Sequence, residues 1–267
     1  MDIQLRLGGF FTIFFLLMLW ESLYPRKTQM TTRLQRWPNN FTLGLINVLC
    51  VQATLMGIGL LTAQWVQLQG WGLLQLAHWP AGIEMLCSLL GLDLLIYVQH
   101  RLFHQWPWLW RWHRVHHTDL ALDVSSGVRF HPVEAIISLG LKQLGIVVLG
   151  VSPMNVLIFE LSLSLLALFN HSNIYIPEPL ENSLRKVLIT PDLHRIHHSV
   201  IREEQQKNFG FSVPWWDQCF GSFQAKAQLP ADQIILGDGI LDTPAQTQSL
   251  KALLKDIPLR SQERFHP

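Results

Sequence analysis

The sequence is poor in charge for its length. Of its 267 residues, 15% are charged and 49% are hydrophobic, and the mean hydropathy is +0.22. This composition is unusual for a water-soluble domain and is typical of a membrane protein. The formal net charge is +1 with all twelve histidines counted as neutral, so no bulk charge would attract a polyanion. We therefore expect no nucleic-acid partner.

Cysteine motifs and cofactor-binding motifs are also missing. The three cysteines, Cys50, Cys87 and Cys219, lie far apart and form no C-x-x-C pair, which excludes a disulfide framework and a thiolate metal site. No G-x-G-x-x-G turn, haem-attachment motif or iron–sulfur cysteine run occurs, so we expect electrons for any redox reaction to come from another protein. Any bound metal must be held by nitrogen and oxygen atoms.

Long apolar segments predict an all-α integral membrane protein with about four to five membrane-embedded helices. Residues 7–20 with their flanks, residues 41–64 and residues 81–104 each reach the roughly twenty residues that a spanning helix needs. Residues 132–170 are apolar but interrupted by the sequence GVSPMN, which predicts a helical hairpin. A cleaved signal peptide is the competing interpretation of residues 7–20, but no small-x-small cleavage site follows them.

Charge placement predicts the orientation of these helices. The loop after the first apolar segment is basic, with Arg26, Lys27, Arg33 and Arg36, so the positive-inside tendency places it in the cytoplasm. The tryptophan-rich residues 65–80 are too short and interrupted to span and suit an interfacial segment on the far side. The crossings then bring the histidine-rich sequences to a cytoplasmic helical cap, where we expect a dimetal site. The compact size favours the bacterial inner membrane.

Histidines are concentrated in three short sequences. HRLFH places His100 and His104 four residues apart, where both rings share one face of a helix and can reach one metal ion. HRVHH and HRIHH each place three rings on one helical stripe. Their histidines are His113, His116, His117, His194, His197 and His198. These eight rings are too many for one ion, and without metal each unpaired buried nitrogen would cost about 1–3 kcal/mol.

Five sequences, in this order, carry a resemblance to a known family: DLLIYVQHRLFH, HRVHHTD, RFHPVE, TPDLHRIHH and NFGFSVPWWDQCFGSF. They resemble the membrane-bound fatty acid hydroxylase and sterol desaturase superfamily over roughly residues 81–223. We accordingly divide the chain into N-terminal transmembrane helices with an interfacial segment (residues 1–80), a hydroxylase-like catalytic domain (81–224) and a cytoplasmic tail (225–267).

The resemblance implies a non-haem di-iron oxygenase that uses dioxygen to hydroxylate or desaturate an unactivated C–H position of a fatty acyl, sterol or related lipid. The eight histidines of the three sequences would be its catalytic and metal-binding residues, with two iron ions as cofactor and zinc able to replace them in purified material. His131 and His171 occupy places where members of this family complete their metal sites, although each could instead be a supporting or core residue. An external ferredoxin or cytochrome would supply electrons. The oligomeric state stays open.

Carboxylates near the histidines are candidates for orienting them, because a ligating histidine usually donates its other N–H to a carboxylate or carbonyl. Asp93 lies two helical turns before His100, and the other candidates are Asp119, Glu134 and Asp192. Each could alternatively be a helix cap, a polar contact or a solvated surface group. A basic surface around the three histidine sequences would suit an acidic electron donor or lipid phosphates. Its residues are Arg101, Arg111, Arg114, Arg195, Arg202 and Lys207.

Two other functional classes compete with an oxygenase. A histidine-rich membrane metal transporter, or a metal-binding protein without oxygenase activity, could use the same rings, but a transporter should distribute polar residues along a path through the bilayer. A di-haem cytochrome would pair axial histidines on facing helices, and the triplets crowd the rings too closely for that. Within the family, isomerase or lyase chemistry is a further alternative.

Overall fold

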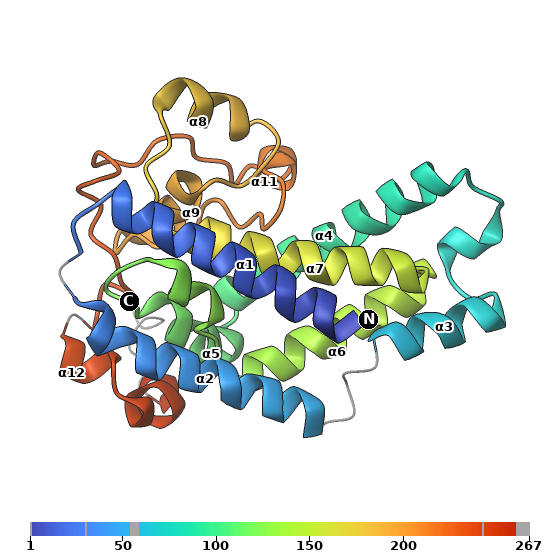
Figure 1. The fold of residues 1–267 in the computed structure, drawn as a ribbon, viewed down its shortest axis with the longest axis horizontal. Coiled ribbons are helices and arrows are strands. Elements are labelled where there is room, and N and C mark those ends of the chain that lie inside the picture. The colour runs from blue at the N-terminus through green and yellow to red at the C-terminus, as the bar shows by residue number, and fades with distance from the viewer. Residues whose placement is uncertain (1, 30, 54–58, 242, 260–267) are drawn as a thin grey trace.

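The structure is a computed structural model that describes residues 2–29, 31–53, 59–241 and 243–259. Long helices lie lengthwise in a bundle, and most of the short elements gather at one end of it, whereas η1 lies at the other (Figure 1). The long helices are α1 (Asp2–Leu23), α2 (Arg33–Ala53), α3 (Gly59–Gln69), α4 (Ala81–Gln105), α6 (Pro132–Leu149) and α7 (Pro153–His171). The shorter elements are η1 (Leu73–Leu76), α5 (Pro107–His117), η2 (Val124–Val128), α8 (Glu178–Leu184), α9 (Pro191–His197), α10 (Arg202–Gln205), α11 (Trp215–Cys219), α12 (Pro244–Thr247), η3 (Ala252–Asp256) and α13 (Ile257–Leu259).

Three of the described helices, α4, α6 and α7, are long and apolar enough to cross a membrane. A shorter apolar helix covers Leu7–Leu23, within α1. Many large apolar side chains of these helices are exposed, among them Leu86 of α4, Leu144 of α6 and Met154 of α7. An apolar surface of this kind is stable against lipid and unstable against water. The prediction of an all-α membrane protein is confirmed.

The segment predicted as one span over residues 41–64 differs in the structure. It is covered by α2, which begins at Arg33, and α3, which ends at Gln69, while residues 54–58 lie outside the described residues. The apolar pattern does not predict that α2 begins at Arg33, because the first turns of this helix are polar. Arg36 and Asn40 are nevertheless fully buried there, since each has hydrogen-bonding partners in the segment after α5.

The predicted hairpin over residues 132–170 is formed by α6 and α7. Gly150 ends α6 with a φ of 74°, a left-handed conformation that glycine adopts without strain, and the Ser152 side chain caps α7. The backbone of Gly72, between α3 and η1, packs against this turn so closely that a Cβ added there would lie 2.2 Å from the Gly150 nitrogen. The hairpin therefore returns the chain to the end of the bundle from which it came.

A buried charge network joins α2 to the loop between α5 and η2. Arg36 donates to both carboxylate oxygens of Asp119 at 2.7 Å and to Asp123 at 2.6 Å. It also donates to the Ala121 carbonyl at 2.6 Å and to the Ser126 hydroxyl at 2.9 Å. Burial is the largest single influence on the pKa of Asp119 and raises it, but the charges of Arg36 and Arg129 and the hydrogen bonds from Arg36 and Ser126 together hold this pKa well below its usual range. This network fixes the segment that follows the second histidine sequence.

Candidate metal centre

The histidine sequences lie where four helices meet at one end of the bundle. His100 and His104 lie in the last turns of α4, the triplet of HRVHH lies in α5, and His171 is the last residue of α7. The triplet of HRIHH occupies α9 and its C-terminal cap. The helices α5 and α9 begin with a proline, which lacks an N–H at a position where a helix leaves it unpaired. Sequence positions far apart are thus brought to one place.

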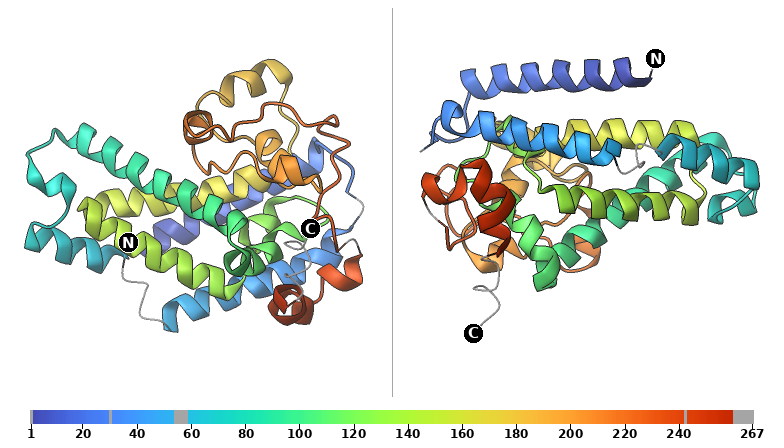
Figure 2. Two further views of the ribbon diagram at one scale, coloured as in Figure 1. Left: turned by 180° about the vertical axis from the view of Figure 1, so that it is seen from behind. Right: turned by 90° about the horizontal axis from the view of Figure 1, so that it is seen from below.

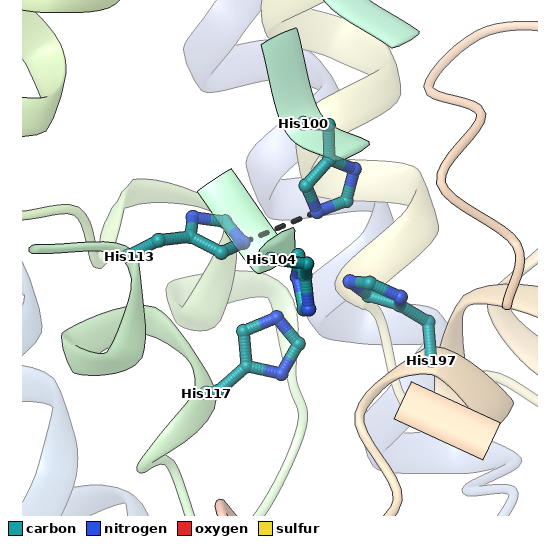
Figure 3. Close-up of side chains that lie close together, drawn as sticks. All are labelled: His100, His104, His113, His117 and His197. Carbon is teal, nitrogen blue, oxygen red and sulfur yellow. Dashed lines mark hydrogen bonds between the residues drawn. The ribbon is translucent and has the colours of Figure 1, made fainter. Parts of the chain in front are cut away.

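Nine buried histidines form two groups. The five-histidine group consists of His100, His104, His113, His117 and His197, and the four-histidine group consists of His116, His171, His194 and His198. Within each group, one nitrogen of every ring lies within 4.8 Å of the others. Figure 3 shows the rings of the five-histidine group directed toward one another from α4, α5 and α9. Each group could hold one metal ion.

Hydrogen bonds fix which nitrogen of four rings carries the proton. The Nδ1–H of His100 donates to the Phe209 carbonyl at 2.8 Å, and that of His113 donates to Glu134 at 2.7 Å. In a neutral imidazole the other nitrogen, Nε2, then has only a lone pair. The Nε2 atoms of His100 and His113 nevertheless lie 3.1 Å apart. Two lone pairs at this distance repel each other unless a cation lies between them.

The four-histidine group shows the same arrangement. The Nδ1–H of His116 donates to the Arg129 carbonyl and that of His171 to the Ala167 carbonyl, yet their Nε2 atoms are 2.9 Å apart. His194 Nε2 lies 2.9 Å from that of His171. Two nitrogens that each bind one ion at about 2.1 Å, at a right angle to each other, are about 3.0 Å apart. The residues therefore fit two metal ions, one in each group.

Burial keeps the rings outside the membrane helices neutral. Desolvation, followed by neighbouring imidazoles, holds the pKa of His116, His117 and His198 well below its ordinary value, and burial lowers the pKa of His197 to about 3. Among the described residues, neither ring nitrogen of His117 has a hydrogen-bond partner, and neither does His197 Nε2. Neutral rings with lone pairs directed into a buried space are the form that binds metals.

His131 is the one candidate ligand that the structure leaves outside both groups. It caps α6, where its Nδ1 accepts from the Val133 N–H at 3.1 Å, and its Nε2–H donates to the Leu254 carbonyl at 3.3 Å. Both ring nitrogens are occupied, so no lone pair remains for a metal. His171, in contrast, lies within hydrogen-bonding distance of two rings of the four-histidine group.

The candidate orienting carboxylates have different partners. Glu134 accepts from His113, but the other three contact no histidine by hydrogen bond in the described part of the chain. Asp93 accepts from the Ser212 N–H and the Trp216 indole, at 3.2 and 2.9 Å. Asp119 pairs with Arg36, and Asp192 pairs with Arg26 at 2.9 Å. These three side chains hold the surrounding segments in place.

Backbone carbonyls orient four of the other grouped rings, those of His100, His116, His171 and His197, and side-chain patterns cannot reveal them. The Nδ1–H of His197 donates to the Lys207 carbonyl at 2.8 Å, and that of His100 donates to the Phe209 carbonyl. The loop that carries both carbonyls is held by Asp217, which accepts from the backbone N–H groups of Phe209 and Gly210 at 2.8 and 2.7 Å. Asp217 lies in the sequence NFGFSVPWWDQCFGSF and was not among the candidate orienting carboxylates.

An apolar cavity of about 950 Å³ extends from the histidines along the membrane helices. Phenylalanine side chains of α1 and α2 form much of its wall, and α1 lies along the outside of the bundle (Figure 2). Rings of both groups reach its surface. They are His100, His113, His116, His171 and His194. A volume of this size is in the upper range for small-molecule sites. The candidate metal centre therefore lies at the inner end of a space suited to a lipid chain.

Comparisons with known proteins agree with this site. An ornithine lipid hydroxylase from Rhizobium tropici is 31% identical over 147 residues, covering 55% of this chain and 43% of that protein. A human alkylglycerol monooxygenase is 27% identical over 152 residues, covering 55% of this chain and 32% of that protein. A human cholesterol 25-hydroxylase is 28% identical over 150 residues, covering 55% of this chain and 53% of that protein.

The chain spans about half the length of these curated relatives or less. No solved structure matches the chain. The model of the family described as fatty acid hydroxylase matches residues 85–222, which are just over half of the sequence. These residues include all nine histidines of the two groups. The chain therefore belongs to the fatty acid hydroxylase family.

Proposed function

We propose that this protein is a membrane-bound non-haem di-iron oxygenase that hydroxylates a C–H bond of a lipid. The overall reaction would consume the lipid, one dioxygen molecule, two electrons and two protons, and would yield the hydroxylated lipid and water. The observation that carries this proposal is the position of two histidine groups at the inner end of an apolar cavity. The printed names of the three relatives, two hydroxylases and one monooxygenase, favour hydroxylation over desaturation.

In this proposal each group holds one iron ion. The five-histidine group and the four-histidine group would provide the ligands, which makes His171 a ligand and excludes His131. Bound iron would supply the redox chemistry with dioxygen that breaks a strong C–H bond. Neutral imidazoles would leave the ions with their full positive charge, and hydrogen bonds at Nδ1 hold five of the nine rings with the Nε2 lone pair directed inward.

The lipid would enter from the bilayer and place an alkyl segment in the cavity. The phenylalanine side chains of α1, including Phe10 and Phe14, provide an apolar wall that excludes water from the site. Residues of α4, α6 and α7 form other parts of the cavity lining and would position the chain beside the histidines. A metal transporter would need a polar path, and the cavity that reaches these histidines is mainly apolar.

Electrons would come from a separate ferredoxin or cytochrome that docks on the cytoplasmic face of the bacterial inner membrane. Arg101, Arg111, Arg202 and Lys207 retain some exposure and could contribute to a basic docking surface. Arg114 and Arg195 are fully buried, so they are unsuited to contact either a donor protein or lipid phosphates. The basic surface is therefore smaller than the sequence suggested.

The proposal is tested by lipid analysis of cells that express the wild-type chain or the variant His197→Ala. His197 belongs to the five-histidine group, whereas His78 is an exposed histidine outside both groups, so His78→Ala is the matched control. We expect a lipid that has gained one oxygen atom in cells with the wild-type chain and with His78→Ala, and none with His197→Ala. Purified wild-type protein should contain about two iron ions per chain. Identical lipid profiles for all three chains, or purified protein that binds less than one transition-metal ion, would contradict the proposal.

A further inference from the structure

Four polar side chains other than histidine lie close together in the lining of the cavity, most of which is apolar. They are Asn47 from α2, Gln99 from α4, and Glu134 and Ser138 from α6. We call these four residues the polar wall. Glu134 and Ser138 are one turn apart on α6, so they share a face of that helix. The polar wall is therefore built along the first turns of α6.

Hydrogen bonds join the four side chains to this one region. The Gln99 amide donates to the Ser138 hydroxyl at 2.7 Å, which connects α4 to α6. The Asn47 amide donates at 2.8 Å to the carbonyl of Phe130, immediately before the α6 cap. Glu134 accepts from His113. These contacts place the polar wall next to the five-histidine group, because Gln99 also directly precedes His100 in α4.

Three acceptor atoms of the polar wall accept no hydrogen bond from the described residues. Asn47 Oδ1, Gln99 Oε1 and Glu134 Oε2 are each buried, and none has a hydrogen-bond partner among the described residues. Leaving one such atom unpaired costs about 1–3 kcal/mol. Three in one wall of an apolar cavity are therefore expensive unless a ligand provides hydrogen-bond donors.

We propose that the polar wall binds a hydroxyl or amide N–H group of the lipid, next to the carbon that is oxidised. The position of that carbon rests on the proposed oxygenase function, whereas the binding of the donor group does not. Lipids that carry a hydroxyl or amide near the oxidised position are therefore the preferred substrate class. The remainder of the lipid lies against the phenylalanine side chains of α1, which offer no hydrogen bonds. A hydrocarbon segment remote from any polar group would leave the three acceptors unpaired.

The binding is tested with two probes that differ only in one hydroxyl, octadecan-1-ol and octadecane. Purified full-length protein loaded with zinc, which has no redox chemistry, is equilibrated in detergent micelles with tritiated octadecan-1-ol, and each unlabelled probe is used to displace it. We expect octadecan-1-ol to bind about tenfold more tightly than octadecane, which corresponds to about 1.4 kcal/mol. Equal affinities for the two probes would overturn the proposal.

Variants of the polar wall separate its contribution from binding of the hydroxyl to zinc. The double variant Asn47→Leu with Gln99→Leu should reduce the preference to about twofold, because Glu134 Oε2 is then the one remaining acceptor of the polar wall. Each single variant should reduce it to about threefold, and these decide the question if the double variant does not fold. Ser164→Ala is the matched control, because the Ser164 hydroxyl also lines the cavity but donates to its own helix at Glu160. It should keep the tenfold preference. An unchanged tenfold preference in the Asn47 and Gln99 variants would overturn the proposal.

The iron-loaded protein distinguishes this proposal from the proposed function. If the zinc protein shows the preference but the iron protein with a reductant oxidises neither probe nor host lipids, the polar wall stands and the oxygenase function fails. If oxidation occurs without a preference for the alcohol, the oxygenase function stands and the polar wall fails. With both correct, oxidation of octadecan-1-ol should be concentrated at the carbons nearest the hydroxyl, as determined by fragmentation of the product in a mass spectrometer.

Discussion

The side chain of Asp217 should control metal affinity although it contacts no histidine by hydrogen bond in the described residues. Its Oδ1 accepts from the Phe209 N–H at 2.8 Å and from the Ser222 hydroxyl at 2.6 Å, and its Oδ2 accepts from the Gly210 N–H at 2.7 Å. Phe209 in turn supplies the carbonyl that accepts from His100. The carboxylate thus fixes the loop that orients one ring of the five-histidine group.

The substitution Asp217→Asn disturbs this loop in either orientation of the new amide. Each carboxylate oxygen faces a backbone N–H, so the amide nitrogen must meet one of these donors. Loss of one hydrogen bond to a charged group costs about 1.5–3 kcal/mol, before any donor–donor repulsion. The loop relieves the repulsion by moving, which shifts the Phe209 carbonyl away from His100. Loss of such a supporting contact lowers metal affinity by about 10–100-fold.

Competition with a chelator of known affinity measures this effect in purified protein. Asp192→Asn is the matched control, because Asp192 lies two residues before the third histidine sequence but pairs with the partly exposed Arg26. Its loss should leave metal affinity within about twofold and stability within about 1 kcal/mol, as for other partly exposed ion pairs. If Asp217→Asn binds metal as tightly as the wild-type protein, or if Asp192→Asn weakens it equally, the assigned support of His100 is wrong.

Four further substitutions test the fold and the ligand assignment. Arg36→Met leaves two buried carboxylates without their cation and should cost about 3–5 kcal/mol, seen as a fall of about 10 °C in the Tm of the detergent-solubilised protein. Gly127→Ala should lower the free energy of unfolding by about 1–3 kcal/mol, because the added Cβ would lie 2.7 Å from the Ala167 carbonyl oxygen. A denaturant titration should show unfolding at a lower denaturant concentration. Gly82→Ala has open space around its Cβ and should be neutral or stabilising by about 0.5–1 kcal/mol in the same titration. His131→Ala should lower the free energy of unfolding by about 1 kcal/mol, because the cap of α6 is lost. Its metal content, measured by mass spectrometry, should equal that of the wild-type protein, and loss of one ion would make His131 a ligand.

The histidine sequences could be found from spacing because their geometry is local. Rings three and four residues apart share a helix face whatever surrounds the helix, so each triplet was recognisable before the structure was known. The division of the rings between the two groups could not be predicted from their spacing in the sequence. His116 and His117 are neighbours in sequence but belong to different groups, because α5 lies between rings contributed by α4 and rings contributed by α7 and α9.

The supporting contacts were harder to predict because they depend on residues far away in the chain. Asp119 follows the second histidine sequence directly, yet its partner Arg36 is in α2. The rings of His100 and His197 donate to carbonyls of a single loop, and a backbone carbonyl leaves no mark on the sequence. The polar start of α2 was overlooked for a related reason. Low hydropathy describes a residue alone, whereas burial depends on the partners that the fold provides.

The division of each histidine group among distant helices has a consequence for how the protein is made. Both groups include rings from α9, which follows every described helix that is long and apolar enough to cross a membrane. If each group holds one ion as proposed, neither ion could have its complete set of ligands before the ribosome has synthesised α9. Metal loading would then follow insertion of the earlier helices, and a chain stalled before α9 would lack the proposed oxygen-reactive centre, which could otherwise damage the surrounding membrane.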